Sequence, residues 1–303
     1  ELSRPGGGAT AARWARLARI ARRDLPTARL AEGHADAVAI LAEHGREAVP
    51  EAAYGVWASR AGGGARLGSD RGGLWLSGTV RFCSGTHALD RALVVAGTGD
   101  GSTRIVDLDL RTPRLERRAG AWRAAGMAES DTQDVLLHDV PVSPESVVGG
   151  PDGYTRRPGF AHGGAGVAAV WLGGAAGIVD EIADGLRGSE PDPHRLSGLG
   201  VLHTVVTAAD ALLGVTAAAI DADPGDPHRR AVQAARAGVE RACRTVLDTG
   251  PETAGVTALA GRDRLAARLA DLQLYLRQHH GARDLAELGR IVLDLSLIHI
   301  SEP

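Results

Sequence analysis

Residues 75–84 bring two aromatic rings, a thiol and a hydroxyl together: Trp75, Phe82, Cys83 and Ser84. A strand that only fills a core does not need this combination. An aromatic ring can pack on a planar ligand, and a hydroxyl can hydrogen-bond to it. The thiol sits in an apolar strand pattern, where burial raises the pKa of a cysteine and suppresses its reactivity. We therefore expect Cys83 to be buried, and the stretch to form either one wall of a binding site or an ordinary strand core.

A second candidate for chemistry is the pair His279-His280. Neighbouring residues on a helix point about 100° apart, so the pair is a poor metal clamp, and no metal site is predicted. His279 follows Leu276 by three positions and extends the apolar stripe of a predicted helix. A neutral histidine can act as a base near pH 7, although a hydrogen-bonded histidine near a helix end explains the same pattern.

The glycine-rich segment GGAGVAAVWLGG at residues 163–174 contains GAGVAA, which resembles a dinucleotide fingerprint. No strand precedes it, no βαβ unit surrounds it, and no acidic residue follows on a second strand. We interpret these small residues as a surface that lets another helix pack closely.

The composition excludes several classes of protein. The 303 residues carry a net charge of -3, which does not favour nucleic-acid binding. All 34 basic residues are Arg, which excludes chemistry that depends on a phosphate-loop lysine or a Schiff base. The two cysteines are far apart in sequence, and no apolar run approaches the ~18 residues of a membrane span. We expect a cytoplasmic protein that does not contact a membrane.

Both ends of the sequence indicate a fragment. The chain begins at Glu1, and residues 295–303, LSLIHISEP, resemble the in-frame translation of a transposase adapter used to build sequencing libraries. We expect this last segment to be foreign to the natural protein and leave it out of the fold prediction.

Hydrophobic periodicity divides the remaining chain into three parts. Helical spacing comes first, with a break at Pro26, then alternating strand patterns, then helical spacing again. Asp100-Gly101 predicts a hairpin turn, and residues 141–153 and Gly250-Pro251 predict joints. Predicted helices cover residues 14–41, 166–186, 199–220, 229–247 and 263–280; predicted strands cover 54–57, 72–82, 91–96, 104–110 and 135–140.

These patterns predict an α+β multidomain protein. A partial N-terminal helical domain covers residues 1–50, a central antiparallel β-barrel or sandwich domain covers 51–150, and a C-terminal helical bundle covers 151–294. An antiparallel sheet is expected because no helix separates the strands.

Three groups of segments resemble the acyl-CoA dehydrogenase family, in a divergent bacterial branch. RRDLPTARLAEGHADAVAILAEHG at residues 22–45 resembles the end of its N-terminal domain. GLWLSGTVRFCSG and GMAESDTQDVLLHDVPVSPESVVG resemble its β domain, and LYLRQHHGARDLAELGR at residues 274–290 resembles a C-terminal segment. The resemblance implies the same helix–β–helix order as the periodicity.

The resemblance also implies an FAD site. Two β segments of the family line the flavin between the β domain and the helical bundle, and the matching residues are Tyr54, Val56 and Trp57 with Phe82, Cys83 and Ser84. Phe82 and Ser84 keep the aromatic ring and the hydroxyl that the family places against the flavin. Trp57 replaces a usual Thr.

The reaction implied is α,β-dehydrogenation of an acyl-CoA or acyl-carrier thioester, within lipid metabolism. It would use an electron-transfer flavoprotein as a partner and a homodimeric or homotetrameric assembly. Both positions where the family carries its catalytic Glu lack an acid here, and the alignment brings His279 or His280 to one of them. Two alternatives stay open: a flavin-dependent monooxygenase on the same fold, and a non-catalytic helical scaffold.

Overall fold

The computed structural model describes residues 2–120, 122–187, 190–261 and 263–300, with side chains described as far as residue 294. They form two compact units. The helical unit contains residues 1–28, 125–127 and 161–303, and the sheet unit contains residues 29–124 and 128–160. The segment predicted to be adapter-derived ends in residues 301–303, which lie outside the described residues.

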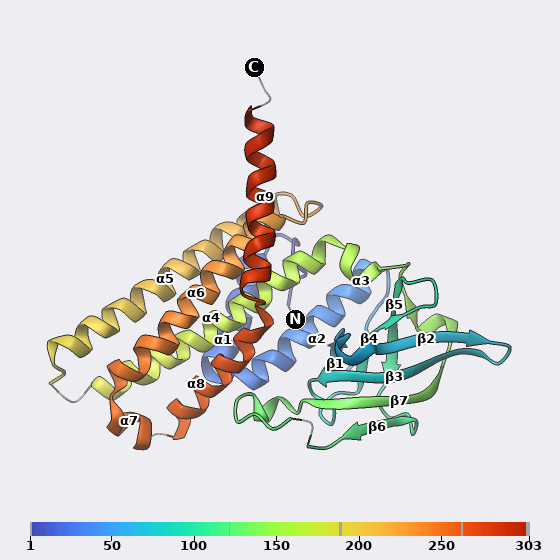
Figure 1. Ribbon diagram of the computed structural model, residues 1–303, viewed down its shortest axis with the longest axis horizontal. Helices are drawn as coiled ribbons and strands as arrows, with labels where there is room; N and C mark the ends of the chain where they lie inside the picture. The colour runs from blue at the N-terminus through green and yellow to red at the C-terminus, as the bar shows by residue number, and fades with distance from the viewer. Residues whose placement is uncertain (1, 121, 188–189, 262, 301–303) are drawn as a thin grey trace. The chain divides into compact units, whose positions relative to one another are not determined.

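The sheet unit contains eight strands of one mixed sheet, in the order β6-β7-β3-β2-β4-β5-β8 with β1 paired to β4 (Figure 1). Its elements are most of α2 (Leu25–Glu43), β1 (Tyr54–Trp57), η1 (Ala61–Gly63), β2 (Gly64–Asp70), β3 (Gly73–Cys83), β4 (Arg91–Gly97), β5 (Thr103–Asp109), β6 (Leu115–Arg118), η2 (Ala128–Ser130), β7 (Gln133–Val142), η3 (Pro144–Ser146), β8 (Val147–Val148) and α3 (Gly153–Arg156).

The prediction of a purely antiparallel sheet is wrong at two pairings. Strands β1 and β2 both run parallel to β4, whereas the other pairs are antiparallel. The predicted hairpin at Asp100-Gly101 is confirmed, because β4 and β5 pair in register from Arg91↔Asp109 to Gly97↔Thr103. Parallel pairing joins strands that are distant in sequence, so local periodicity does not reveal it.

The core of the sheet unit contains Cys83, as predicted. The Cys83 thiol is fully buried among apolar side chains of β3, β4 and β7 such as Val80, Val94 and Val135. Burial raises its pKa far above the ordinary value, so it stays a thiol. A smaller apolar cluster holds the ring of Tyr54 with Ile40.

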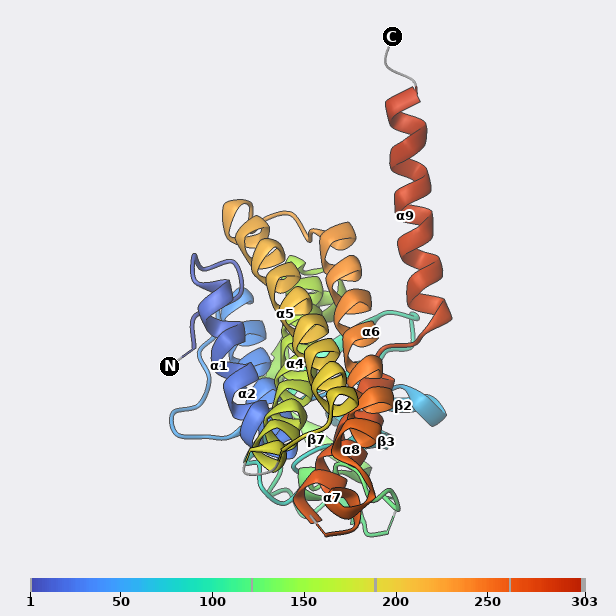
Figure 2. The same ribbon diagram turned by 90° about the vertical axis from the view of Figure 1, so that its left-hand side faces the viewer.

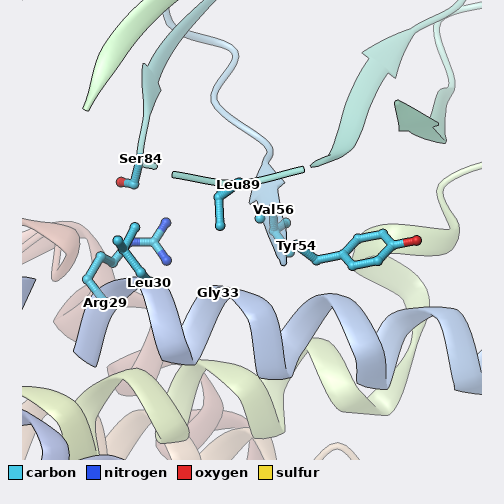
Figure 3. A pocket seen from close by; sticks show the side chains of 8 residues that line it. Arg29, Leu30, Gly33, Tyr54, Val56, Ser84 and Leu89 are labelled. Carbon is cyan, nitrogen blue, oxygen red and sulfur yellow. The ribbon is translucent and has the colours of Figure 1, made fainter. Parts of the chain in front are cut away.

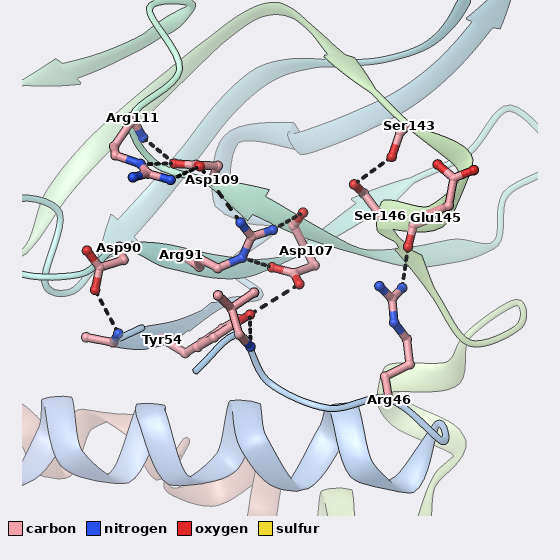
Figure 4. Close-up of polar contacts among 12 residues, drawn as sticks. Arg46, Tyr54, Asp90, Arg91, Asp107, Asp109, Arg111, Ser143, Glu145 and Ser146 are labelled. Carbon is pink, nitrogen blue, oxygen red and sulfur yellow. Dashed lines mark hydrogen bonds and ion pairs between the residues drawn. The ribbon is translucent and has the colours of Figure 1, made fainter. Parts of the chain in front are cut away.

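A network of charges ties β4 to β5 and to Tyr54 (Figure 4). Arg91 Nε donates to Asp107 Oδ1 at 2.8 Å, and the Tyr54 hydroxyl donates to Asp107 Oδ2 at 3.4 Å. Arg111, at the exposed end of the network, donates to Asp109 at 2.6 Å. Asp107 is buried, so it depends on Arg91 for its charge balance.

We expect Arg91→Ala to lower the free energy of unfolding by about 3 kcal/mol, because it leaves the Asp107 carboxylate buried without its cation. Arg111→Ala is the matched control, since it removes an exposed Arg–Asp pair and should cost below about 1 kcal/mol. Urea unfolding of both variants measures the difference. Equal losses would show that burial of Asp107 does not govern the network.

The helical unit contains several long helices, the last of which projects away from the others (Figures 1 and 2). They are α1 (Thr10–Arg23), most of α4 (Pro158–Leu186), α5 (Pro193–Ala222), α6 (Arg229–Ala254), α7 (Val256–Gly261), α8 (Asp263–Tyr275), η4 (Leu276–Gln278) and α9 (Ala282–Ile300).

Two predicted helix ends in this unit are wrong. Gly250-Pro251 lies inside α6 and does not end it, because Gly250 packs against Ile182 and tertiary contacts override the local propensity. The helix predicted over residues 263–280 ends at Tyr275 and tightens into the η4 turn, so His279 has extended backbone.

Small residues on α4 let α1 approach closely, which confirms the interpretation of the glycine-rich segment. A Cβ atom added at Gly173 would lie 2.3 Å from the Ala18 carbonyl oxygen, and one at Gly177 would lie 2.4 Å from the Arg22 carbonyl oxygen. No side chain fits at that spacing, so these glycines set the distance between the two helices.

Helices α4 and α5 are long and apolar enough to cross a membrane, which corrects the expectation that no segment approaches this length. The apolar stretch of α4 is 78% buried, as in a core helix, whereas that of α5 is 28% buried. A core helix of a soluble protein meets the same criterion, so length and composition alone do not assign either helix to a membrane.

We expect Gly173→Ala to destabilise the protein by about 2 kcal/mol, because the new methyl group meets the α1 backbone. Gly214→Ala is the control: Gly214 lies within α5 with no atom near its Cβ position, so alanine should stabilise the helix by up to about 1 kcal/mol. Thermal unfolding measures both. A stabilising Gly173→Ala would contradict the close packing of α1 on α4.

Candidate functional site

A small pocket in the sheet unit brings together three of the predicted cofactor-binding residues (Figure 3). Tyr54 and Val56 reach it from β1, and Ser84 reaches it from the segment after β3. Arg29 and Leu30 rise toward it from α2, whereas the Tyr54 ring points away. The complete lining is Arg29, Leu30, Gly33, Tyr54, Gly55, Val56, Ser84 and Leu89.

Leu89 keeps this pocket small. A Cβ atom at Gly55 would lie 2.6 Å from Leu89 Cδ1, and one at Gly85 would lie 2.7 Å from Leu89 Cγ. Gly85 also has a φ of +73°, which favours glycine. The cavity volume is about 10 Å³, room for about one water. A planar cofactor does not fit inside this pocket.

Phe82 is exposed on a strained turn of β3. Its side chain is 50% exposed, and its φ of 61° is uncommon for any residue with a Cβ atom. The pairing of β3 with β7 shifts between Val80 and Cys83, which is where this bulge lies. Asp134 holds it: the Phe82 backbone N–H donates to Asp134 Oδ1 at 3.2 Å, and Arg81 Nε donates to Asp134 Oδ2 at 3.3 Å.

The two predicted cofactor-binding segments are in direct contact. Trp57 is buried, and its indole Nε1 donates to the Ser84 carbonyl oxygen at 3.2 Å. The Ser84 hydroxyl is half-buried and accepts from Thr132 Oγ1 at 3.1 Å. Cys83, between Phe82 and Ser84, faces the core and does not line the pocket.

The two histidines lie in the helical unit, and their surroundings differ. His279 is 5% exposed, with its ring edge-on to Trp171 at 6.4 Å between centroids, whereas His280 is exposed. The Gly281 backbone N–H donates to His279 Nδ1 at 3.2 Å, so the proton of the neutral ring is on Nε2. Nε2 has no hydrogen-bond partner among the described residues.

Burial lowers the pKa of His279 below its ordinary value, and the nearby Arg236 and Arg244 act in the same direction. Glu240 and Asp284 oppose this shift without reversing it. The ring is therefore neutral at pH 7 and able to donate from Nε2.

Several residues of these sites cannot be identified from the sequence alone. Arg29 and Gly33 belong to a helix that shows no functional motif, and Asp134 acts through a strained turn that only long-range pairing creates. Trp171 lies within the glycine-rich segment of α4, where helix packing accounts for its neighbours. The aromatic ring at position 82 and the hydroxyl at position 84 are the features by which the sequence alone indicates the site.

No family model matches the chain. Dibenzothiophene monooxygenases of Rhodococcus erythropolis and Rhodococcus qingshengii are 26% identical to it over 169 aligned residues. The match covers 47% of this chain and 40% of the length of each relative. Similarity over this part does not by itself transfer the activity of the whole relative.

Solved structures share the fold over most of the chain. FMN-bound TdsC, a dibenzothiophene monooxygenase from Paenibacillus sp. A11-2, has a TM-score of 0.81 at 20% identity, covering 93% of this chain and 83% of that chain. KijD3 in complex with FMN and a dTDP-sugar has a TM-score of 0.80 at 20% identity, covering 97% and 80%. Methanesulfinate monooxygenase MsuC from Pseudomonas fluorescens has a TM-score of 0.79 at 16% identity, covering 95% and 88%.

At these identities the likeness establishes the fold alone. The chain has the acyl-CoA dehydrogenase-like fold of these three structures, which confirms the predicted resemblance at the level of the fold. The barrel or sandwich form of the β domain and the three domain boundaries stay predictions.

We expect His279 to make the protein less stable as the pH falls. The unfolded ring has a pKa of about 6.5 and the folded ring a lower one, so protons bind preferentially to the unfolded chain. This contribution is absent above pH ~6.5 and destabilises the folded protein as the pH drops below that value. His279→Gln should therefore lose less stability than the wild type between pH 7 and pH 5 in urea unfolding. Identical pH dependence in both proteins would contradict the neutral buried ring.

Proposed function

We propose that this chain is part of a flavin-dependent monooxygenase that uses FMN. The observation that carries this proposal is Phe82, an exposed aromatic residue held at a positive φ two positions before Ser84, in a fold shared with FMN-binding monooxygenases. Backbone strain at a residue with a Cβ atom persists only where the surroundings impose it, and such residues concentrate at functional sites.

The residues present fit a flavin in their chemistry. Phe82 offers an apolar ring face, Ser84 offers a hydroxyl, and Trp57 fixes the Ser84 backbone through its carbonyl oxygen. The family resemblance predicts FAD, whereas TdsC and KijD3 were solved with FMN, so FMN is the form proposed here. Phe82, Ser84 and the backbone of β1 would hold the ring on the outer surface of the sheet unit.

A bound reduced flavin would supply the two electrons that let O₂ place one oxygen atom in the substrate and release the other as water. This chain then has to orient the cofactor, exclude water and manage protons. Ser84 can donate a hydrogen bond to a polar atom of the ring. Within the helical unit, His279 is the histidine suited to exchange a proton, because its buried ring is neutral and its Nε2–H has no partner among the described residues. The exposed His280 is the weaker candidate for this role.

The comparisons give no support to acyl-CoA dehydrogenation. Acyl-CoA, an acyl-carrier thioester, an electron-transfer flavoprotein and a role in lipid metabolism rest only on the family resemblance. The described residues also hold no acid at the two positions where that family carries its catalytic Glu. The monooxygenase proposal instead requires a separate flavin reductase and O₂.

We expect the purified protein to bind FMN. With NADH, a flavin reductase and O₂ it should oxygenate an aromatic heterocycle, for which dibenzothiophene and indole serve as probes because relatives were named or solved with them. Anaerobic addition of butyryl-CoA should leave the flavin absorption band unchanged. Bleaching of that band by butyryl-CoA would instead establish the dehydrogenase, and a folded protein without flavin affinity would contradict both.

Phe82→Ala should weaken FMN binding about tenfold, because the variant loses one aromatic contact with the ring. Phe160→Ala is the matched control, since Phe160 is 42% exposed and is the other phenylalanine of the chain. Fluorescence titration with FMN compares the two. Equal affinity in the wild type and Phe82→Ala would remove Phe82 from the proposed site.

A further inference from the structure

Three hydroxyl groups form a chain that ends at the candidate site. Ser130 Oγ lies 2.7 Å from Thr132 Oγ1, and Thr132 Oγ1 donates to Ser84 Oγ at 3.1 Å. Ser130 and Thr132 are buried, at 1% and 5% exposure, whereas Ser84 is half-buried and lines the pocket. These three hydroxyl groups therefore lead from the interior of the sheet unit to its surface.

Backbone pairing holds the two segments together. The Gly85 N–H donates to the Ser130 carbonyl oxygen at 2.9 Å, and the Thr86 N–H donates to the Asp131 carbonyl oxygen at 3.1 Å. Asp131 has a φ of 47°, and its carboxylate lies 2.8 Å from His87 Nδ1. These contacts fix the segment that carries Ser130 and Thr132 against the one that carries Ser84.

The number of hydroxyl protons determines which group donates in each of these hydrogen bonds. Each hydroxyl has a single proton. Thr132 gives its proton to Ser84, so its contact with Ser130 must be one in which Ser130 donates. Ser84 accepts from Thr132, and its own proton is then directed away from that oxygen. A hydroxyl that already accepts a hydrogen bond is a stronger donor, because such bonds polarise one another.

We propose that Thr132 is a positioning residue that makes Ser84 a hydrogen-bond donor to the flavin ring. This inference rests on the proposed function and adds a residue to it that contacts no cofactor. Trp57 fixes the backbone of Ser84 through its carbonyl oxygen, and Thr132 fixes the direction of its hydroxyl. Trp57 and Thr132 belong to different segments, so both segments are needed to fix the backbone and the hydroxyl of Ser84.

The test compares Thr132→Val with Thr132→Ser. Valine keeps the shape of threonine and removes the hydroxyl, whereas serine keeps the hydroxyl. We expect Thr132→Val to weaken FMN binding about tenfold and to shift the visible absorption band of the bound flavin. Thr132→Ser should restore both to within about twofold of the wild type. Thr155→Val, at an exposed threonine of α3, should change neither.

The outcomes separate this inference from the proposed function. If the wild type fails to bind FMN, the proposed function fails. If the wild type binds FMN and folded Thr132→Val matches it in affinity and spectrum, only the role of Thr132 fails. Should Thr132→Val not fold, Ser130→Ala takes its place, measured once with Ser84 present and once in a Ser84→Ala background. Ser130→Ala should then shift the flavin band in the presence of Ser84 and not in its absence. A shift in both backgrounds would contradict the proposal that these hydroxyl groups act through Ser84.

Discussion

The attachment of the segment after β3 to the segment before β7 is the constraint on which the candidate site depends. Backbone hydrogen bonds join Gly85 to Ser130 and Thr86 to Asp131, and Asp134 holds the bulge at Phe82. This attachment places three successive side chains in three environments. The Phe82 ring is exposed, the Cys83 thiol is in the core, and the Ser84 hydroxyl reaches the pocket. A regular strand would alternate between two faces and could not do this.

In the helical unit, close packing of α4 determines the surroundings of His279. Glycines on α4 bring α1 to backbone contact, and the same helix carries Trp171, against which the His279 ring packs edge-on. The ring is thereby removed from water, which keeps it neutral and leaves Nε2 as its available donor. Close packing in this unit therefore sets the protonation state of its proposed functional histidine.

Sequence reasoning succeeds here where the pattern is local. Strand β5 is predictable because Val106 and Leu108 alternate with aspartates, and the burial of Cys83 and His279 follows from their spacing with apolar residues. Strand β2 was missed because its sequence, GARLGSD, has no apolar alternation and its position comes from pairing with β3 and β4.

The candidate site was predictable in its residue types and not in its geometry. Phe82 and Ser84 were identifiable by type, whereas the positive φ of Phe82 depends on Asp134, a residue 52 positions away. The contact between Trp57 and Ser84 likewise joins two segments that only the folded sheet brings together. Hydrogen bonds between distant segments leave no period in the sequence, so neither feature is visible before the fold is known.

The burial of the sulfur atoms has a consequence for how a protein with the proposed function would resist oxidation. Proteins that combine reduced flavin with O₂ release some hydrogen peroxide, and peroxide oxidises accessible thiolates and thioethers. This chain has two cysteines and one methionine, and Cys83, Cys243 and Met127 are all buried. Burial also raises the pKa of both thiols, so neither presents a thiolate. The folded chain thus offers peroxide few targets, and oxidative inactivation should begin with local unfolding.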